Sequence, residues 1–173
     1  MKQQIQALFR DKKHFAAMTA EIDIQVVGFE EYSFSKSVMQ VDILMVPKKE
    51  IGTVKDAFSA LFKKELFDSE EWPLEEEPNK KDAEWLNALE NVWIPAYFGM
   101  LNQIDIQAVS PTRFFSYLHN DLAAVETPLK IVELLLEKMD KPELIQVQKG
   151  YTYRRIFGQS STHYFFFDYG IYD

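Results

Sequence analysis

Apolar and polar residues alternate in two segments near the N-terminus, and this pattern predicts strands. In "EIDIQVVGF", residues 21–29, apolar residues at every second position alternate with Asp23 and Gln25, as expected of a strand with one face in water. "SVMQVDILMVP", residues 37–47, is more continuously apolar and predicts a buried strand that Pro47 ends. The two segments therefore predict two successive strands.

Other segments place their apolar residues at helical spacing. Residues 2–17 and 81–93 each carry apolar side chains along one face, and residues 49–67 do so most clearly. The apolar stripe of residues 49–67 consists of Ile51, Val54, Phe58, Leu61 and Phe62. We therefore expect an N-terminal helix, then two strands, then a second helix.

Two later helices are predicted from the residues that begin them. Ser110 before Pro111 has the order of a helix N-cap followed by proline at the first helical position. Thr127 before Pro128 repeats that order. We expect two consecutive helices, each starting at one of these caps.

The end of the chain predicts strands again. Residues 143–173 are dense in β-branched and aromatic residues and are interrupted at Lys149-Gly150 and at "GQSS", which predicts three antiparallel strands in a meander. In "THYFFFDYGIYD" the aromatic residues alternate onto both faces, so both faces need cover. Such a strand is either central in its sheet or has an interface on its second face. Homo-oligomer formation through this strand is therefore one hypothesis.

Nearly the same heptapeptide occurs twice, as "EIDIQVV" in residues 21–27 and "QIDIQAV" in residues 103–109. An internal duplication could produce this, but different sequences follow the two copies, and their separation exceeds the usual repeat length of solenoids. We interpret the similarity as two strands that meet the same structural requirement.

Composition fits one soluble domain. A chain of 173 residues with 47% hydrophobic residues has the size and apolar content for one self-supporting core. The absence of cysteine excludes disulfides, thiolate metal ligands and a thiol nucleophile, and it fits a reducing cytoplasm. The sequence contains neither a recognisable signal peptide nor an apolar run long enough to span a membrane. Lysine greatly outnumbers arginine, which is associated with bacterial or phage coding bias.

Negative charge is concentrated in one segment. Residues 68–90 hold nine acidic residues and two lysines, a net charge of −7, whereas the whole chain carries −8. Within it, residues 68–80 contain two prolines and are predicted to be exposed. Trp72 lies between acidic residues, followed closely by the run Glu75, Glu76 and Glu77. These four residues form our candidate site for a basic protein partner, which the charge would steer and the aromatic ring would anchor; a plain solvated loop is the alternative.

Recognisable catalytic and cofactor patterns are missing. The acidic segment lacks the spacing and turn glycine of a calcium loop, and the histidines lack metal-ligand spacing. Glycine-rich phosphate loops and the G-x-S-x-G elbow are also absent. We therefore predict no metal site and no cofactor. An enzyme or small-ligand site could still be assembled from distant residues, and the candidates are Asp42, His119, Arg154 and His163.

"KGYTYRRI", residues 149–156, resembles the signature of the RNA-recognition motif, which has a basic residue, glycine and spaced aromatic residues. The resemblance implies base stacking on a sheet face. Thr152 and Arg154 depart from the pattern, and the acidic net charge makes nucleic acid an unlikely partner. We prefer a hairpin strand in which Tyr151, Tyr153 and Phe157 pack inward and Arg154 is solvated.

These observations predict a single α+β domain over residues 1–173. It should contain an antiparallel or mixed sheet of about five or six strands, three to five helices and a C-terminal β-meander. The preferred function is a non-enzymatic, cytoplasmic protein-binding module, such as an inhibitor or immunity-type antagonist of a basic partner. The alternative is an enzyme or small-ligand-binding protein.

Overall fold

The computed structural model describes residues 1–8, 24–32, 37–68, 106–149 and 153–172. Within these residues the helices are α1 (Lys2–Leu8), α3 (Val54–Asp68), α6 (Pro111–Ala124) and α7 (Leu129–Lys138). The strands are β1 (Gln25–Tyr32), β2 (Val38–Pro47), β3 (Gln107–Val109), β4 (Glu143–Lys149), β5 (Tyr153–Gln159) and β6 (His163–Tyr172). Helices and strands together confirm the predicted α+β fold.

The strands form one six-stranded sheet in the order β1-β2-β6-β5-β4-β3. Every neighbouring pair is antiparallel, and β4, β5 and β6 form the predicted C-terminal meander. The aromatic strand β6 lies between β2 and β5, so both of its edges are hydrogen-bonded within the chain. Pairing of two chains along β6 would therefore have to displace β2 or β5. Homo-oligomer formation through this strand stays a prediction.

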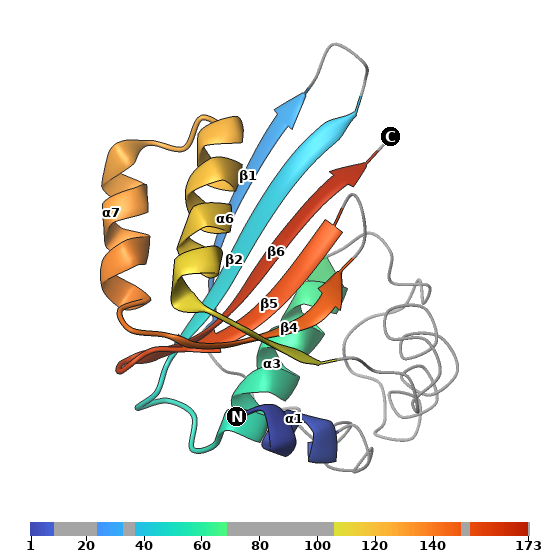
Figure 1. The fold of residues 1–173 in the computed structure, drawn as a ribbon, viewed down its shortest axis with the longest axis vertical. Helices are drawn as coiled ribbons and strands as arrows, with labels where there is room; N and C mark the ends of the chain where they lie inside the picture. Colours follow the sequence, from blue (N-terminus) through green and yellow to red (C-terminus); the bar gives the residue numbers. More distant parts are fainter. Residues whose placement is uncertain (9–23, 33–36, 69–105, 150–152, 173) are drawn as a thin grey trace.

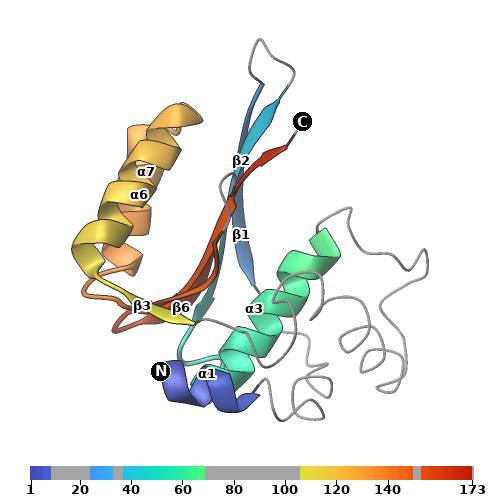
Figure 2. The same cartoon turned by 45° about the vertical axis from the view of Figure 1, so that its right-hand side comes forward.

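Helices cover both faces of the sheet. Figure 2 shows α6 and α7 on one side of the strands and α1 and α3 on the other. Figure 1 shows that the N-terminal helix α1 lies close to α3 although β1 and β2 separate them in the sequence. The described part of the chain is therefore a three-layer sandwich, and both faces of β6 receive the cover that its aromatic pattern predicted.

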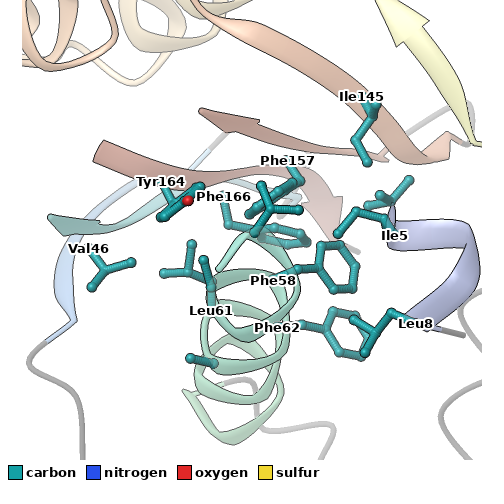
Figure 3. Packing of buried hydrophobic residues seen from close by; sticks show 14 of the residues in the cluster. Ile5, Leu8, Val46, Phe58, Leu61, Phe62, Ile145, Phe157, Tyr164 and Phe166 are labelled. Atoms are coloured by element: carbon teal, nitrogen blue, oxygen red, sulfur yellow. The ribbon is translucent and has the colours of Figure 1, made fainter. Parts of the chain in front are cut away.

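One hydrophobic core lies between the sheet and the helices α1 and α3 (Figure 3). The apolar stripe of α3 points toward the sheet, and α1 adds Ile5 and Leu8 at its side. At the centre, the Phe58 ring contacts the rings of Phe157 and Phe166 edge-on, with centroids 5.1 and 6.2 Å apart. This geometry adds to the free energy gained by burying the rings.

The second core lies between the opposite face and the helices α6 and α7. Phe114, Leu118 and Leu122 follow one another at four-residue spacing on α6 and are buried against the sheet. The Phe114 ring lies over both Phe165 and Phe167 of β6, with centroid distances of 5.7 and 5.8 Å. Successive residues of β6 thus pack in opposite cores, because side chains alternate between the two faces of a strand.

The two similar heptapeptides occupy matching places at opposite edges of the sheet. The first enters the edge strand β1 at Gln25, and the second enters the edge strand β3 at Gln107. Ile24 and Ile106, just before these strands, both pack in the core beside α1 and α3. This arrangement agrees with the interpretation that both segments meet the same structural requirement.

Only one of the two predicted caps has the expected form. The Ser110 side chain accepts a hydrogen bond from the Arg113 N–H at 3.3 Å, with Pro111 in the first turn, as predicted. At α7 the prediction was wrong by one residue, because Pro128 occupies the N-cap and makes no side-chain cap bond. The Thr127 hydroxyl is buried there without a hydrogen-bond partner.

Candidate functional site

A row of polar residues on α6 faces the start of β5 and the end of β6. Arg113, Tyr117 and Asp121 are spaced by four residues and therefore lie along one side of the helix. Arg113 is exposed, Tyr117 is half-buried and Asp121 is buried. Opposite them, Arg154 of β5 and Tyr169 of β6 are directly paired neighbours in the sheet. We call these five residues the Arg154 cluster.

The guanidinium of Arg154 is held between two aromatic rings. Its Cζ lies 4.3 Å from the centroid of the Tyr117 ring and 4.6 Å from that of the Tyr169 ring. Its Nη1 lies 3.3 Å from Oδ2 of Asp121. Contact with the faces of two rings limits the positions that the guanidinium can take.

The electrostatics of the cluster centre on Asp121. Burial raises the pKa of Asp121 from its ordinary value of 3.8 to about 6, although Arg154 partly offsets this by favouring the carboxylate. Burial also raises the pKa of Tyr169, and the negative charge of Asp121 adds to that shift. The cluster therefore contains a carboxyl group that changes its charge near physiological pH.

Replacing Asp121 by asparagine should change how stability depends on pH. Between about pH 4 and pH 6 the folded protein keeps the Asp121 proton that the unfolded chain releases, so the free energy of unfolding falls as pH rises through this window. Asp121→Asn removes that dependence. As pH rises from about 4 to about 6, we expect urea denaturation to show that the free energy of unfolding of the variant increases by about 1–2 kcal/mol relative to that of the wild type. This is less than the full pKa shift implies, because water reaches part of the site. A constant difference between the two proteins would contradict the raised pKa.

A buried ion pair lies on the opposite face of the sheet. Nε of Arg155 donates a hydrogen bond to Oδ2 of Asp168 at 3.1 Å, and both side chains are less than one-tenth exposed. The two residues are cross-strand partners on β5 and β6. Oδ1 of Asp168 is buried and has no hydrogen-bond partner. This carboxylate therefore depends strongly on Arg155.

Asp42 extends the same row of polar residues into β2. It is the cross-strand partner of Asp168 and accepts a hydrogen bond from the Gln40 side chain. On the edge strand, a Cβ at Gly28 would lie only 2.7 Å from Oδ1 of Asp42. Glycine at this position therefore leaves room for the carboxylate beside the sheet edge.

The four residues of the predicted ligand site do not come together. Asp42 lies on the α1 and α3 face, whereas Arg154 lies on the α6 and α7 face. His119 is exposed on α6. His163 starts β6, where its Nδ1 lies 2.8 Å from the Thr162 hydroxyl and burial lowers its pKa. Of the four, only Arg154 belongs to the Arg154 cluster.

The predicted partner-binding residues lie outside the described part of the chain. This applies to Trp72, Glu75, Glu76 and Glu77, and to Tyr151 in the segment that resembles the RNA-recognition motif. Phe157, the residue after that segment, packs inward as predicted, but Tyr153 within it is 40% exposed. Arg154 is not simply solvated, because it is stacked and ion-paired.

Sequence reasoning missed the partners of Arg154. The four-residue spacing of Arg113, Tyr117 and Asp121 was a usable signal, since it places an acid, a base and a phenol on one side of a predicted helix. Nothing in the sequence indicated that Arg154, far along the chain, would meet this side of α6.

The described residues contain no group of three or more histidine, cysteine or acidic residues placed to hold a metal ion. Among the helices in the described ranges, none has the length and apolar character needed to cross a membrane.

The chain shows no detectable similarity to known proteins. It matches no protein-family profile, no curated protein and no solved structure. Functional inference therefore depends on this chain's own residues.

Proposed function

We propose that the protein is a protein-binding module that recognises a basic partner through its acidic segment, as an inhibitor or immunity-type antagonist does. The observation that carries the proposal is the distribution of charge, because residues 68–90 account for −7 of the net charge of −8. A concentrated charge of this kind speeds the approach of an oppositely charged surface. Trp72 within it supplies an aromatic anchor of the type that dominates binding energy in interfaces.

The fold supports this proposal by supplying a rigid base. The described strands and helices form a sandwich with two ring-rich cores, and such a base can carry a binding segment without refolding when a partner arrives. The complete lack of cysteine fits a partner met in a reducing compartment, and we place the protein in the cytoplasm as part of the same proposal.

Neutralising Glu75, Glu76 and Glu77 to glutamine should weaken the complex without affecting the fold. Each substitution keeps the side-chain shape and removes one charge, so the association rate should fall most and the salt dependence of binding should flatten. We expect the association rate to fall by about tenfold or more at low salt. Surface plasmon resonance with the captured partner measures both quantities.

A matched control variant separates a local effect from one of net charge. Glu133→Gln, Glu137→Gln and Asp140→Asn remove the same number of negative charges from exposed positions on and just after α7. The control should bind almost as the wild type does. Equal weakening in the two variants would show that only total charge matters, and this result would overturn the proposal.

A further inference from the structure

We propose that the Arg154 cluster is a recognition site for an oxyanion, the carboxylate or the sulfate-like or phosphate group of a ligand. The Arg154 cluster would bind a negatively charged ligand, whereas the acidic segment would bind a positively charged partner. This inference therefore does not depend on the proposed function. The observation behind it is that Arg154, which lies between the sheet and α6, has a single ion-pair partner among the described residues.

Within the described part of the chain, Arg154 has hydrogen-bonding capacity that no neighbour uses. Among the described residues, Asp121 is its one polar contact, and Oδ2 of Asp121 is a buried atom without a hydrogen-bond partner. The pair is thus close in space but not hydrogen-bonded. A guanidinium has five donors in a planar fork that matches an oxyanion. The contacts with the Tyr117 and Tyr169 rings limit where this guanidinium can lie. About a quarter of the Arg154 side chain, 23%, is exposed, which gives a small anion access to it.

Further groups around Arg154 favour an anion. Arg113 is exposed, and its Nε donates to the Tyr117 hydroxyl at 2.6 Å while its Cζ lies 5.4 Å from the centre of the same ring. The Tyr117 hydroxyl accepts this bond and so keeps its own proton to donate. Two arginines therefore contact the same phenol in an otherwise acidic protein.

Asp121 sets the condition under which the site binds. As a carboxylate it competes with a ligand for Arg154 and repels it, whereas as a neutral acid it does neither. Among the described residues, Arg154 from β5 and Tyr169 from β6 are the charged and titratable groups that interact with it, and Tyr117 lies one turn away on α6. Since burial raises the pKa of Asp121 to about 6, anion binding should strengthen as pH falls through that value.

Nuclear magnetic resonance of the full ¹⁵N-labelled chain tests the site directly. The arginine Nε–H signals are followed while sulfate, and separately acetate, is added at constant ionic strength kept with sodium chloride. We expect the Arg154 signal, identified by its loss in Arg154→Lys, to shift and saturate with at least one anion. Saturation with sulfate indicates a phosphate-like ligand group, and saturation with acetate a carboxylate. No saturable shift with either anion would overturn the proposal.

Variants distinguish a specific site from general attraction. Arg113→Met changes an exposed residue and should weaken binding by about tenfold or more, because a charged donor is lost. Lys130→Met removes an exposed charge from α7 and should leave the affinity unchanged. Equal weakening by these two substitutions would contradict a specific site. The glutamine variant of Glu75, Glu76 and Glu77 should bind sulfate as the wild type does, which keeps this test separate from that of the acidic segment.

The pH profile excludes a merely structural role for the pair. Sulfate keeps its charge over the relevant range, so its affinity for the wild type should rise as pH falls from about 8 to about 5.5 with the titration of Asp121. Asp121→Asn should bind at the higher pH as tightly as the wild type does at the lower pH, and its own pH dependence should be flat. Identical pH profiles for the two proteins would overturn the proposal.

Discussion

Replacing Arg155 with methionine should lower the free energy of unfolding by about 3–5 kcal/mol, since it leaves the buried Asp168 carboxylate without its partner. Arg155 makes the ion pair at 3.1 Å, and the other oxygen of Asp168 has no hydrogen-bond partner to compensate for the loss. Methionine fills a similar volume, so the expected cost is mainly electrostatic. Urea denaturation of the wild type and the variant at neutral pH measures it.

The reference points for this measurement are a second substitution and an exposed control. Adding Asp168→Asn to Arg155→Met removes the stranded charge, so the double variant should be more stable than Arg155→Met alone. Arg113→Met, on the surface of α6, should change stability by about 0.5 kcal/mol or less. A cost below about 1 kcal/mol for Arg155→Met would mean that the pair behaves as a surface ion pair and that our description of it is wrong.

Phe58→Ala should have an effect of similar size from a different cause. Phe58 is completely buried at the centre of the core beside α3, where its ring contacts Phe62, Phe157 and Phe166. Removing the ring forfeits its burial and leaves a cavity that rigid neighbours cannot fill, which costs about 3–5 kcal/mol. The denaturation midpoint should fall while the dependence on denaturant concentration stays the same.

An exposed leucine provides the control for Phe58→Ala. Leu129 begins α7 with 80% of its surface exposed, so Leu129→Ala should change stability by about 0.5 kcal/mol or less. If Phe58→Ala costs no more than Leu129→Ala, the core beside α3 is not arranged as described.

Local patterns predicted strands and helices of the described residues because each depends on residues close together in the sequence. The helix predicted over residues 81–93 lies outside the described residues. The alternation in residues 163–172 indicated a strand covered on both faces, and β6 proves to be central. The Ser110 cap was predicted because its bond spans only three residues. The predicted Thr127 cap failed even though it has the same sequence order, because Pro128 takes the N-cap position and the side chain of Thr127 does not reach the helix.

The candidate site could be predicted only in part because its contacts join distant segments. Arg154 was named as a candidate, but its contacts with Tyr117 and Asp121 depend on how α6 lies across the sheet. The difference between Arg154 and Arg155 shows the same limit. These neighbours face opposite cores, and each meets an acid that its sequence position does not indicate. Because side chains alternate along a strand, Arg154 and Arg155 must point to opposite faces of the sheet. Which residues each of them contacts depends on the tertiary fold.

Affinity capture of the tagged protein from its native lysate, at low and at moderate salt, tests the central claim most directly. Mass spectrometry then identifies and quantifies what is retained. The charge distribution of this chain predicts a stoichiometric basic protein that is held at low salt and released as salt rises. Retention of no stoichiometric basic protein, or of one whose binding ignores salt, would contradict recognition through the acidic segment.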